Sequence, residues 1–226
     1  MRTIAISDIH GCYNELKSLL AILETKGKYN KDTDRLIFLG DYVDRGEDSR
    51  KVIQLIRSLQ KDNDNVIALM GNHEDMMIGY LNGIKNWWNY NGSDSTLKSY
   101  RMHKSQLKDD LEWMSNLPLY YEDDYFIYVH AGVDVNKTME EQSRHDLLWT
   151  REPFLSDATP YYKRVVFGHT PTLNFGTDKP VYTSANNIGI DTGCVYYGAL
   201  TALVIEDDKV ECFYQVEMED NKKYNV

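Results

Sequence analysis

The chain has 226 residues, a length that fits one domain or one domain with a small cap. Asp and Glu number 35 against 25 Lys and Arg, so the formal charge is −10, and this excess of negative charge disfavours general nucleic-acid binding. No apolar run approaches the roughly 20 residues that span a bilayer. We therefore expect neither a nucleic-acid partner nor a membrane partner.

Three cysteines, Cys12, Cys194 and Cys212, are widely spaced along the chain. Their odd number and their spacing indicate reduced thiols rather than a disulfide framework. The first seven residues are too short and too β-like to be the apolar region of a signal peptide. Together these features predict a cytoplasmic protein.

The first 80 residues alternate between predicted strands and helices. Apolar runs at 3–7, 35–40 and 66–70 predict three buried strands. Between them, residues 16–23 and 52–59 place leucine, isoleucine and valine at the spacing of one helix face. This order predicts βαβ units, in which helices cover a parallel sheet.

Residues 82–117 are polar and aromatic and end in a helical stretch. We interpret them as an insertion in a single domain that spans residues 1–226. Its aromatic residues Trp87, Trp88 and Tyr90 either wall a substrate groove or form the core of a small cap.

The second half of the chain is richer in predicted strands. They cover residues 125–130, 164–168, 187–191, 199–206 and 210–216. The last two flank Asp207-Asp208, a plausible hairpin turn. The pattern as a whole predicts an α/β fold in which two packed mixed sheets have helices on their outer faces.

Polar side chains lie at the ends of five predicted strands. In chain order, the segments are DIHG from Asp8, GDYVDRG from Gly40, GNHE from Gly71, HAG from His130 and GHT from Gly168. Because ligands bind at the carboxyl ends of strands in open α/β sheets, these segments predict one shared site. Carboxylate, imidazole and amide ligands without a thiolate suit Mn, Fe or Zn.

This ordered set of motifs resembles the phosphoprotein phosphatase family of calcineurin-like metallophosphoesterases, and in particular its small bacterial and bacteriophage serine/threonine protein phosphatases. The segment GIDTG from Gly189 is also similar to those small members. The resemblance implies a four-layer α/β/β/α sandwich of two mixed sheets flanked by helices. It also implies two divalent metal ions at the strand ends, with Mn expected and Fe or Zn as alternatives.

The resemblance assigns metal ligands residue by residue. One metal takes Asp8 and His10, the other takes Asn72, His130 and His169, and Asp41 bridges both. In the wider superfamily the last motif often reads Gly-His-x-His, and its second histidine is a further ligand. Pro171 stands at that position here and cannot coordinate, so water should complete the shell of the first metal.

The resemblance also implies residues that act on the substrate. His73 becomes the general acid for the leaving oxygen, and Asp44 holds its imidazole. Arg45 and Arg151 become phosphate-binding residues, since a planar guanidinium binds phosphate through two hydrogen bonds. The motif around Arg151 is short, so an ordinary surface salt bridge stays an alternative for it. A hydroxide that bridges the two metals would attack phosphorus directly.

Three functions follow from these residues. The first is dephosphorylation of phosphoserine and phosphothreonine, with a phosphorylated protein or another phosphate ester as the partner. The alternative is symmetrical hydrolysis of diadenosine tetraphosphate, with the insertion binding adenine. GNHE, where those hydrolases more often read GNHD, favours the first. An inactive binding module is disfavoured because every expected ligand and acid is present.

Overall fold

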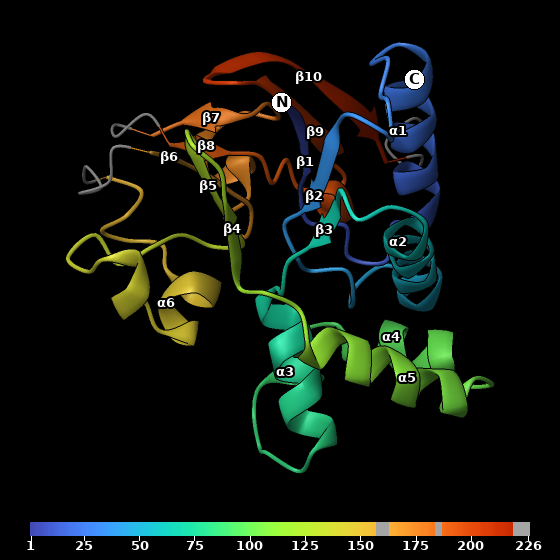
Figure 1. Cartoon of the computed structure of the whole chain (residues 1–226). Helices are drawn as coiled ribbons and strands as arrows, with labels where there is room; N and C mark the ends of the chain where they lie inside the picture. The colour runs from blue at the N-terminus through green and yellow to red at the C-terminus, as the bar shows by residue number, and fades with distance from the viewer. Residues whose placement is uncertain (157–162, 184–186, 219–226) are drawn as a thin grey trace.

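The computed structural model describes residues 1–156, 163–183 and 187–218, and its strands form two five-stranded sheets (Figure 1). The first sheet has the order β10-β9-β1-β2-β3 and the second the order β4-β5-β6-β8-β7. The strands of the first sheet are β1 (Arg2–Ile6), β2 (Arg35–Phe38), β3 (Val66–Ala68), β9 (Ala199–Glu206) and β10 (Lys209–Glu217). Those of the second are β4 (Tyr120–Glu122), β5 (Phe126–Val129), β6 (Arg164–Phe167), β7 (Val181–Tyr182) and β8 (Ile188–Gly189).

Helices cover both outer faces of this pair of sheets. The α-helices are α1 (Tyr13–Thr25), α2 (Ser49–Asp62), α3 (Asn72–Leu81), α4 (Ser93–Tyr100), α5 (Lys104–Ser115) and α6 (Arg144–Trp149). Short 3₁₀ turns are η1 (Trp88–Tyr90), η2 (Met139–Glu141), η3 (Thr172–Phe175) and η4 (Cys194–Tyr196). In Figure 1, α1 and α2 lie outside the first sheet, and α6 lies outside the second.

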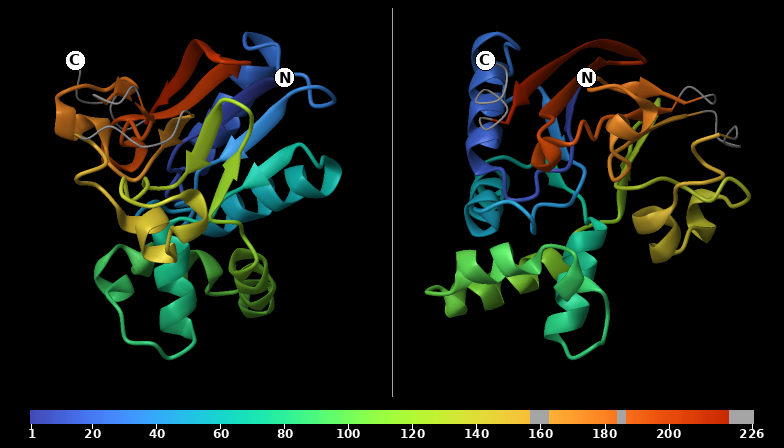
Figure 2. Two further views of the ribbon diagram at one scale, coloured as in Figure 1. Left: turned by 60° about the vertical axis from the view of Figure 1, so that its left-hand side comes forward. Right: turned by 180° about the vertical axis from the view of Figure 1, so that it is seen from behind.

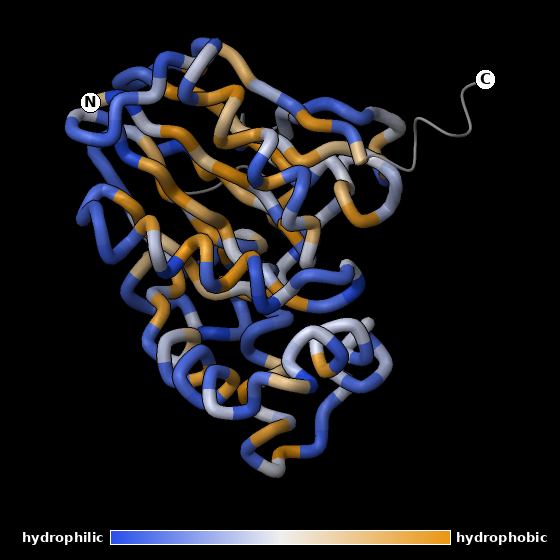
Figure 3. Tube along the Cα trace, turned by 90° about the vertical axis from the view of Figure 1, so that its right-hand side faces the viewer, coloured by the Kyte–Doolittle hydropathy of each residue, from blue (hydrophilic) through white to orange (hydrophobic). Residues whose placement is uncertain are grey.

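The alternation of apolar side chains along the strands produces these layers. On β1, Ile4 and Ile6 join the core beneath α1 and α2, whereas Ala5 points into the core between the sheets. On β5, Tyr128 enters the same inter-sheet core, and Ile127 packs on the outer side with residues of α6. Successive side chains of a strand face opposite ways, so strands that are apolar on both faces must be covered on both. Figure 3 shows these hydrophobic strands at the centre of the molecule and hydrophilic segments around them.

The predicted fold class is confirmed by this architecture. Parallel pairing joins β1 to β2 and β2 to β3, as the alternation of strands and helices predicted. The hairpin at Asp207-Asp208 connects β9 to β10. The sequence did not predict α3, α4, α6, β4 and β7. These elements are short, and their apolar residues do not repeat with a clear period.

The segment interpreted as an insertion carries η1, α4 and α5, which lie with α3 below the two sheets (Figures 1 and 2). Trp88, Tyr100 and Met114 are buried in the same core cluster as the residues beneath α1 and α2. The limits 82–117 and the division into one domain stay predictions. Among the described residues, no helix combines the length and the apolar character that crossing a bilayer requires.

Candidate functional site

Seven predicted site residues converge where strands of both sheets end. Asp8 and His10 follow β1, Asp41 follows β2, Asn72 and His73 begin α3, His130 follows β5 and His169 follows β6. All seven are buried, with at most 7% of any of them exposed to solvent. Parallel pairing of β1 with β2 and of β5 with β6 brings these strand ends to one edge of the sandwich.

One group of ligand atoms gathers around the side-chain oxygen of Asn72. Its Oδ1 lies 2.8 Å from His130 Nε2 and 3.1 Å from His169 Nδ1, and His130 Nε2 lies 3.5 Å from Asp41 Oδ1. His130 Nδ1 donates its hydrogen to the Leu39 carbonyl at 3.0 Å. In a neutral imidazole, Nε2 then carries only a lone pair, so two acceptors face each other at 2.8 Å. A cation between them resolves this conflict, since ligands about 2.1 Å from a metal stand roughly 3–3.5 Å apart.

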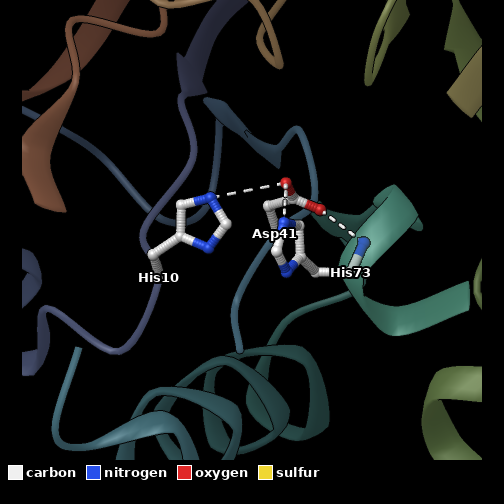
Figure 4. Close-up of side chains that lie close together, drawn as sticks. All are labelled: His10, Asp41 and His73. Carbon is white, nitrogen blue, oxygen red and sulfur yellow. Dashed lines mark hydrogen bonds and ion pairs between the residues drawn. The ribbon is translucent and has the colours of Figure 1, made fainter. Parts of the chain in front are cut away.

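A second group lies on the other side of Asp41 (Figure 4). His10 Nε2 is 3.4 Å from Asp41 Oδ2, and His73 Nε2 is 3.9 Å from the same oxygen. The His10 Nδ1–H donates to the Val43 carbonyl at 2.8 Å, which leaves Nε2 as an acceptor. The two oxygens of Asp41 therefore face one group each, as a bridging carboxylate would.

Asp8 is outside both close groups of ligand atoms and is held by the backbone of another strand end. Its two carboxylate oxygens accept the His169 N–H at 3.1 and 3.0 Å. Burial, followed by the nearby carboxylates of Asp191 and Asp41, raises the pKa of Asp8 well above its usual value. Negative charges crowded together in this way need a positive partner.

The pKa shifts of the other ligand candidates also suit metal binding. Burial lowers the pKa of His10, His130 and His169, so each imidazole is neutral and has a lone pair to give. Burial alone would raise the pKa of Asp41, but the attraction of its carboxylate to the neighbouring imidazoles when they are protonated, together with the His73 N–H that it accepts, lowers it. The neutral imidazoles and the ionised carboxylate are the forms that a divalent cation binds.

His73 is oriented by a network that reaches into the insertion. Its Nδ1 donates to Asp44 Oδ2 at 2.7 Å, and the Trp88 indole donates to the same oxygen at 2.8 Å. The Thr96 hydroxyl donates to Asp44 Oδ1 at 2.7 Å. The insertion thus supplies two of the three side chains that fix the carboxylate, and Nε2 of His73 points towards Asp41.

Glu74 supports the loop that carries Asp41. Its Oε2 accepts the N–H groups of Asp41 at 2.8 Å and Gly71 at 3.0 Å, and its Oε1 accepts those of Tyr42 at 2.8 Å and Val43 at 3.2 Å. Burial and then the charge of Asp41 raise the pKa of Glu74 to about 8, although the hydrogen bonds from Tyr42, Asp41 and Val43 act to lower it. The residue is fully buried and faces the backbone, not the pocket.

The backbone at the site is held in an unusual conformation. His10, Asp41, Asp44, Arg45 and His169 have φ between +44° and +74°. Residues other than glycine rarely adopt the left-handed region, at a cost on the order of 1–3 kcal/mol each. Such conformations persist only where the surrounding structure enforces them, and here they direct the side chains towards one point.

A pocket of about 220 Å³ opens over these side chains and includes both predicted phosphate-binding arginines, Arg45 and Arg151, in its walls. Arg45 contacts His10 Nε2 and lies over the ring of Tyr196, 5.2 Å from its centroid. The Arg45 N–H also donates to the Gly92 carbonyl at 3.0 Å. The alternative of an ordinary surface salt bridge for Arg151 finds no support, since no ion pair of Arg151 occurs among the described residues.

Sequence reasoning gave no role to several residues of this site. Trp88 and Thr96 lie more than 40 positions from Asp44, and no spacing rule connects them. Asp191 lies within GIDTG, a segment noted only for its resemblance, and it lines the pocket. A buried aspartate directly after a strand, in the same position as Asp8 and Asp41, was the signal that could have identified it.

The chain is similar in sequence and in fold to proteins of one known family. The sequence model of the calcineurin-like phosphoesterase family matches residues 1–208. Among curated proteins, the chain is 30% identical to bis(5'-nucleosyl)-tetraphosphatase PrpE [asymmetrical] of Oceanobacillus iheyensis, over 89% of this chain and 88% of that protein. It is also 30% identical to the symmetrical bis(5'-nucleosyl)-tetraphosphatase of Klebsiella pneumoniae, over 76% of this chain and 57% of that protein. A crystal structure provisionally named as a diadenosine tetraphosphatase has a TM-score of 0.73 at 23% identity, over 96% of this chain and 93% of that one.

The predicted activity on phosphoserine and phosphothreonine in proteins is wrong in the light of these relatives, which are named as tetraphosphatases. The choice between the two functions rested on GNHE in place of GNHD. The structure shows why this residue is a poor guide. Glu74 binds four backbone N–H groups beneath Asp41, so its side chain has no contact with the pocket that would receive a substrate.

Proposed function

Because the chain belongs to the calcineurin-like phosphoesterase family of metal-dependent hydrolases, we propose that it hydrolyses dinucleoside tetraphosphates. The observation that carries the proposal is the likeness to tetraphosphatases over most of the chain, combined with a pocket that joins two groups of metal-ligand atoms to two arginines. This substrate was the alternative that the sequence left open.

The metal roles in this proposal follow the two groups of ligand atoms. Asn72, His130 and His169 would hold one divalent cation, and Asp8 and His10 would hold the other. Asp41 would contribute to both, which is supported by its Oδ1 facing His130 and its Oδ2 facing His10. Manganese stays our expectation for the ion, because oxygen and nitrogen ligands without thiolate accept it readily. A cytoplasmic location also stays part of the proposal, supported by three cysteines without disulfide partners.

When bound, two divalent cations lower the pKa of a coordinated water and neutralise charge on the phosphoryl group. The protein side chains do the rest. Arg45 and Arg151 bind phosphate oxygens from the pocket wall, and a chain of four phosphates offers both of them a partner. His73 directs Nε2 towards the reacting group, and Asp44 fixes its ring through Nδ1.

The insertion offers a place for a nucleobase. Trp87 and Tyr90 are 73% and 76% exposed, and their ring centroids lie 5.9 Å apart. Asn91, which follows Tyr90 in the sequence, lines the pocket, and its side-chain amide donates to the Trp87 backbone carbonyl at 2.7 Å. Trp88 between them is fully buried, so the aromatic cluster divides into one core residue and two exposed rings. Stacking of a base on such rings is worth about 1–3 kcal/mol.

A substrate panel tests this function directly. The full chain is stripped with a chelator, reloaded with Mn²⁺, and assayed with diadenosine tetraphosphate, a phosphoserine peptide and p-nitrophenyl phosphate. We expect no activity without metal and the highest kcat/KM for the dinucleotide. Chromatography of the products distinguishes two ADP from AMP plus ATP. A higher kcat/KM for the phosphopeptide would contradict the proposal.

A further inference from the structure

Asp191 brings a second buried carboxylate to the walls of the pocket, which also include Asp41, and it lies near enough to Asp8 to affect its charge. It follows β8, whose neighbour β6 is followed by His169, and only 5% of the residue is exposed. It lines the same pocket as His10, Asp41 and Pro171. The proline side chain has no atom that can bind a cation, whereas the Asp191 carboxylate can offer an oxygen.

The hydrogen bonds of Asp191 leave half of its carboxylate free. Oδ1 accepts the N–H of Gly193 at 3.0 Å and so closes a turn between residues 191 and 193. Among the described residues, Oδ2 accepts no hydrogen bond, and no arginine or lysine lies within ion-pair distance of it. Because the residue is 5% exposed and lines the pocket, a ligand in the pocket can supply a partner for Oδ2.

The local charges favour a cation as that partner. Burial, opposed by the Gly193 hydrogen bond and reinforced by the charge of Asp41, raises the pKa of Asp191 to about 6. Asp191 in turn raises the pKa of Asp8. The charge of Asp41 therefore makes Asp8 and Asp191 harder to ionise, and Arg45 and Arg151 offset this only in part at Asp191. A divalent cation near these carboxylates would offset their mutual repulsion.

The position of Asp191 indicates an indirect contact with the cation. The close groups of ligand atoms among the described residues are His10 with Asp41 and His73, and Asp41 with His130 and His169. Asp8 and Asp191 both lie outside these two groups; Asp8 is assigned as a ligand by its motif, whereas Asp191 has no such motif but lines the pocket that the groups share. A water molecule can span such a gap, with the carboxylate as its acceptor.

We propose that Asp191 is a positioning residue for the cation held by Asp8, His10 and Asp41, and that its free Oδ2 accepts a hydrogen bond from a water bound to that cation. The proposal rests on the metal roles in the proposed function. Outer carboxylates of this kind orient the ligands of a metal and strengthen its binding.

The variant Asp191→Asn separates this role from a structural one. Asparagine keeps the size and an oxygen that can accept the Gly193 N–H, and it replaces the free, charged Oδ2 with an NH₂ group, which cannot accept a hydrogen bond. The matched control is Asp134→Asn, because Asp134 closes a similar turn by accepting the Asn136 N–H at 3.0 Å, in an exposed loop away from the pocket. Both variants are stripped with a chelator and titrated with Mn²⁺ by calorimetry, and the melting temperature is measured without metal.

We expect Asp191→Asn to bind one of two Mn²⁺ ions about 10- to 100-fold more weakly. Its metal-free melting temperature should stay the same or rise, because a buried charge has been removed. Asp134→Asn should bind both ions like the unaltered chain.

Three results would overturn the proposal. The first is unchanged Mn²⁺ affinity at both sites of Asp191→Asn. The second is weaker binding together with a lower metal-free melting temperature, which indicates a folding role. The third is normal metal binding with weaker inhibition by inorganic phosphate, which assigns Asp191 to the arginines instead. If the unaltered chain binds two ions but does not cleave the dinucleotide, only the proposed substrate fails.

Discussion

Replacing His73 with asparagine tests whether this residue is the proton donor of the site. The backbone N–H of residue 73 donates to Asp41 Oδ1 at 2.9 Å, and this bond survives the change. The metal-ligand atoms of Asp41 and Asn72 are not touched. What is lost is the imidazole, with its hydrogen bond from Nδ1 to Asp44 and its Nε2 beside the pocket.

The size of the effect depends on the leaving group. Donation of a proton by a positioned side chain contributes about 10²–10⁴ in rate, or roughly 3–5 kcal/mol of barrier. Phenyl phosphate releases a phenolate whose conjugate acid has a pKa of about 10, as for tyrosine, so it needs the proton and should show the full loss in kcat. p-Nitrophenyl phosphate releases a much less basic oxygen and should lose far less.

Hydrolysis of a dinucleoside tetraphosphate should depend less on the His73 imidazole than hydrolysis of phenyl phosphate. Its leaving group is a nucleoside phosphate, whose last ionisation has a pKa of about 6, so it departs as an anion at neutral pH without a proton. We therefore expect His73→Asn to lose less than about tenfold in kcat on this substrate and about 10²–10⁴ on phenyl phosphate.

The assay compares kcat for the three substrates at saturating Mn²⁺, with metal content measured for each preparation. His103→Asn is the matched control, because His103 is exposed and lies outside both groups of ligand atoms. An equal loss for all three substrates would refute the reasoning, because a missing proton donor cannot act equally on leaving groups of different basicity. Equal losses would point instead to a displaced metal or substrate.

Further changes test the parts around this centre. Trp88→Phe removes the indole N–H that Asp44 accepts, and a bond to a charged group is worth about 1.5–3 kcal/mol, so kcat on phenyl phosphate should fall about 10- to 100-fold while Mn²⁺ affinity is unchanged. Gly92→Ala should raise KM for the dinucleotide several-fold, because the added Cβ would lie 2.7 Å from Arg45 Cγ and displace that side chain. Since Gly92 also has a φ of +91°, Gly83→Ala is the control for backbone strain: Gly83 has a φ of +86° but no atom within 4 Å of an added Cβ. Mn²⁺ at about 100 times its Kd should raise the free energy of unfolding by about 2.7 kcal/mol per site, measured by denaturation with and without metal.

The sequence predicted much of this architecture because its motifs lie on regular elements. Strands with apolar side chains on both faces require cover on both sides, and this requirement leads to two sheets with outer helices. The ends of parallel strands meet at one edge, so Asp8 and Asp41 could be expected together from their positions alone.

Other parts of the site depend on tertiary contacts that no local pattern records. Thr96 reaches Asp44 across 52 positions, from a helix that the sequence did not predict. The left-handed backbone at His10 and His169 is imposed by the surrounding fold, since only a few per cent of residues other than glycine adopt it. For Trp87, Trp88 and Tyr90 the sequence left a groove wall and a cap core as alternatives; Trp88 packs in the core, whereas Trp87 and Tyr90 face solvent, and a role in a groove wall stays a prediction for these two.

The incorrect choice of substrate has the same physical origin. The residue at a motif position next to a metal ligand is informative about the substrate only if its side chain reaches the pocket. The Glu74 side chain instead binds the backbone beneath Asp41. The pocket wall includes Asn91 from the insertion, and that segment also supplies the indole that holds Asp44. Selection of the substrate and orientation of His73 therefore depend on one segment, so a change there that alters substrate preference should also alter the rate of the protonation step.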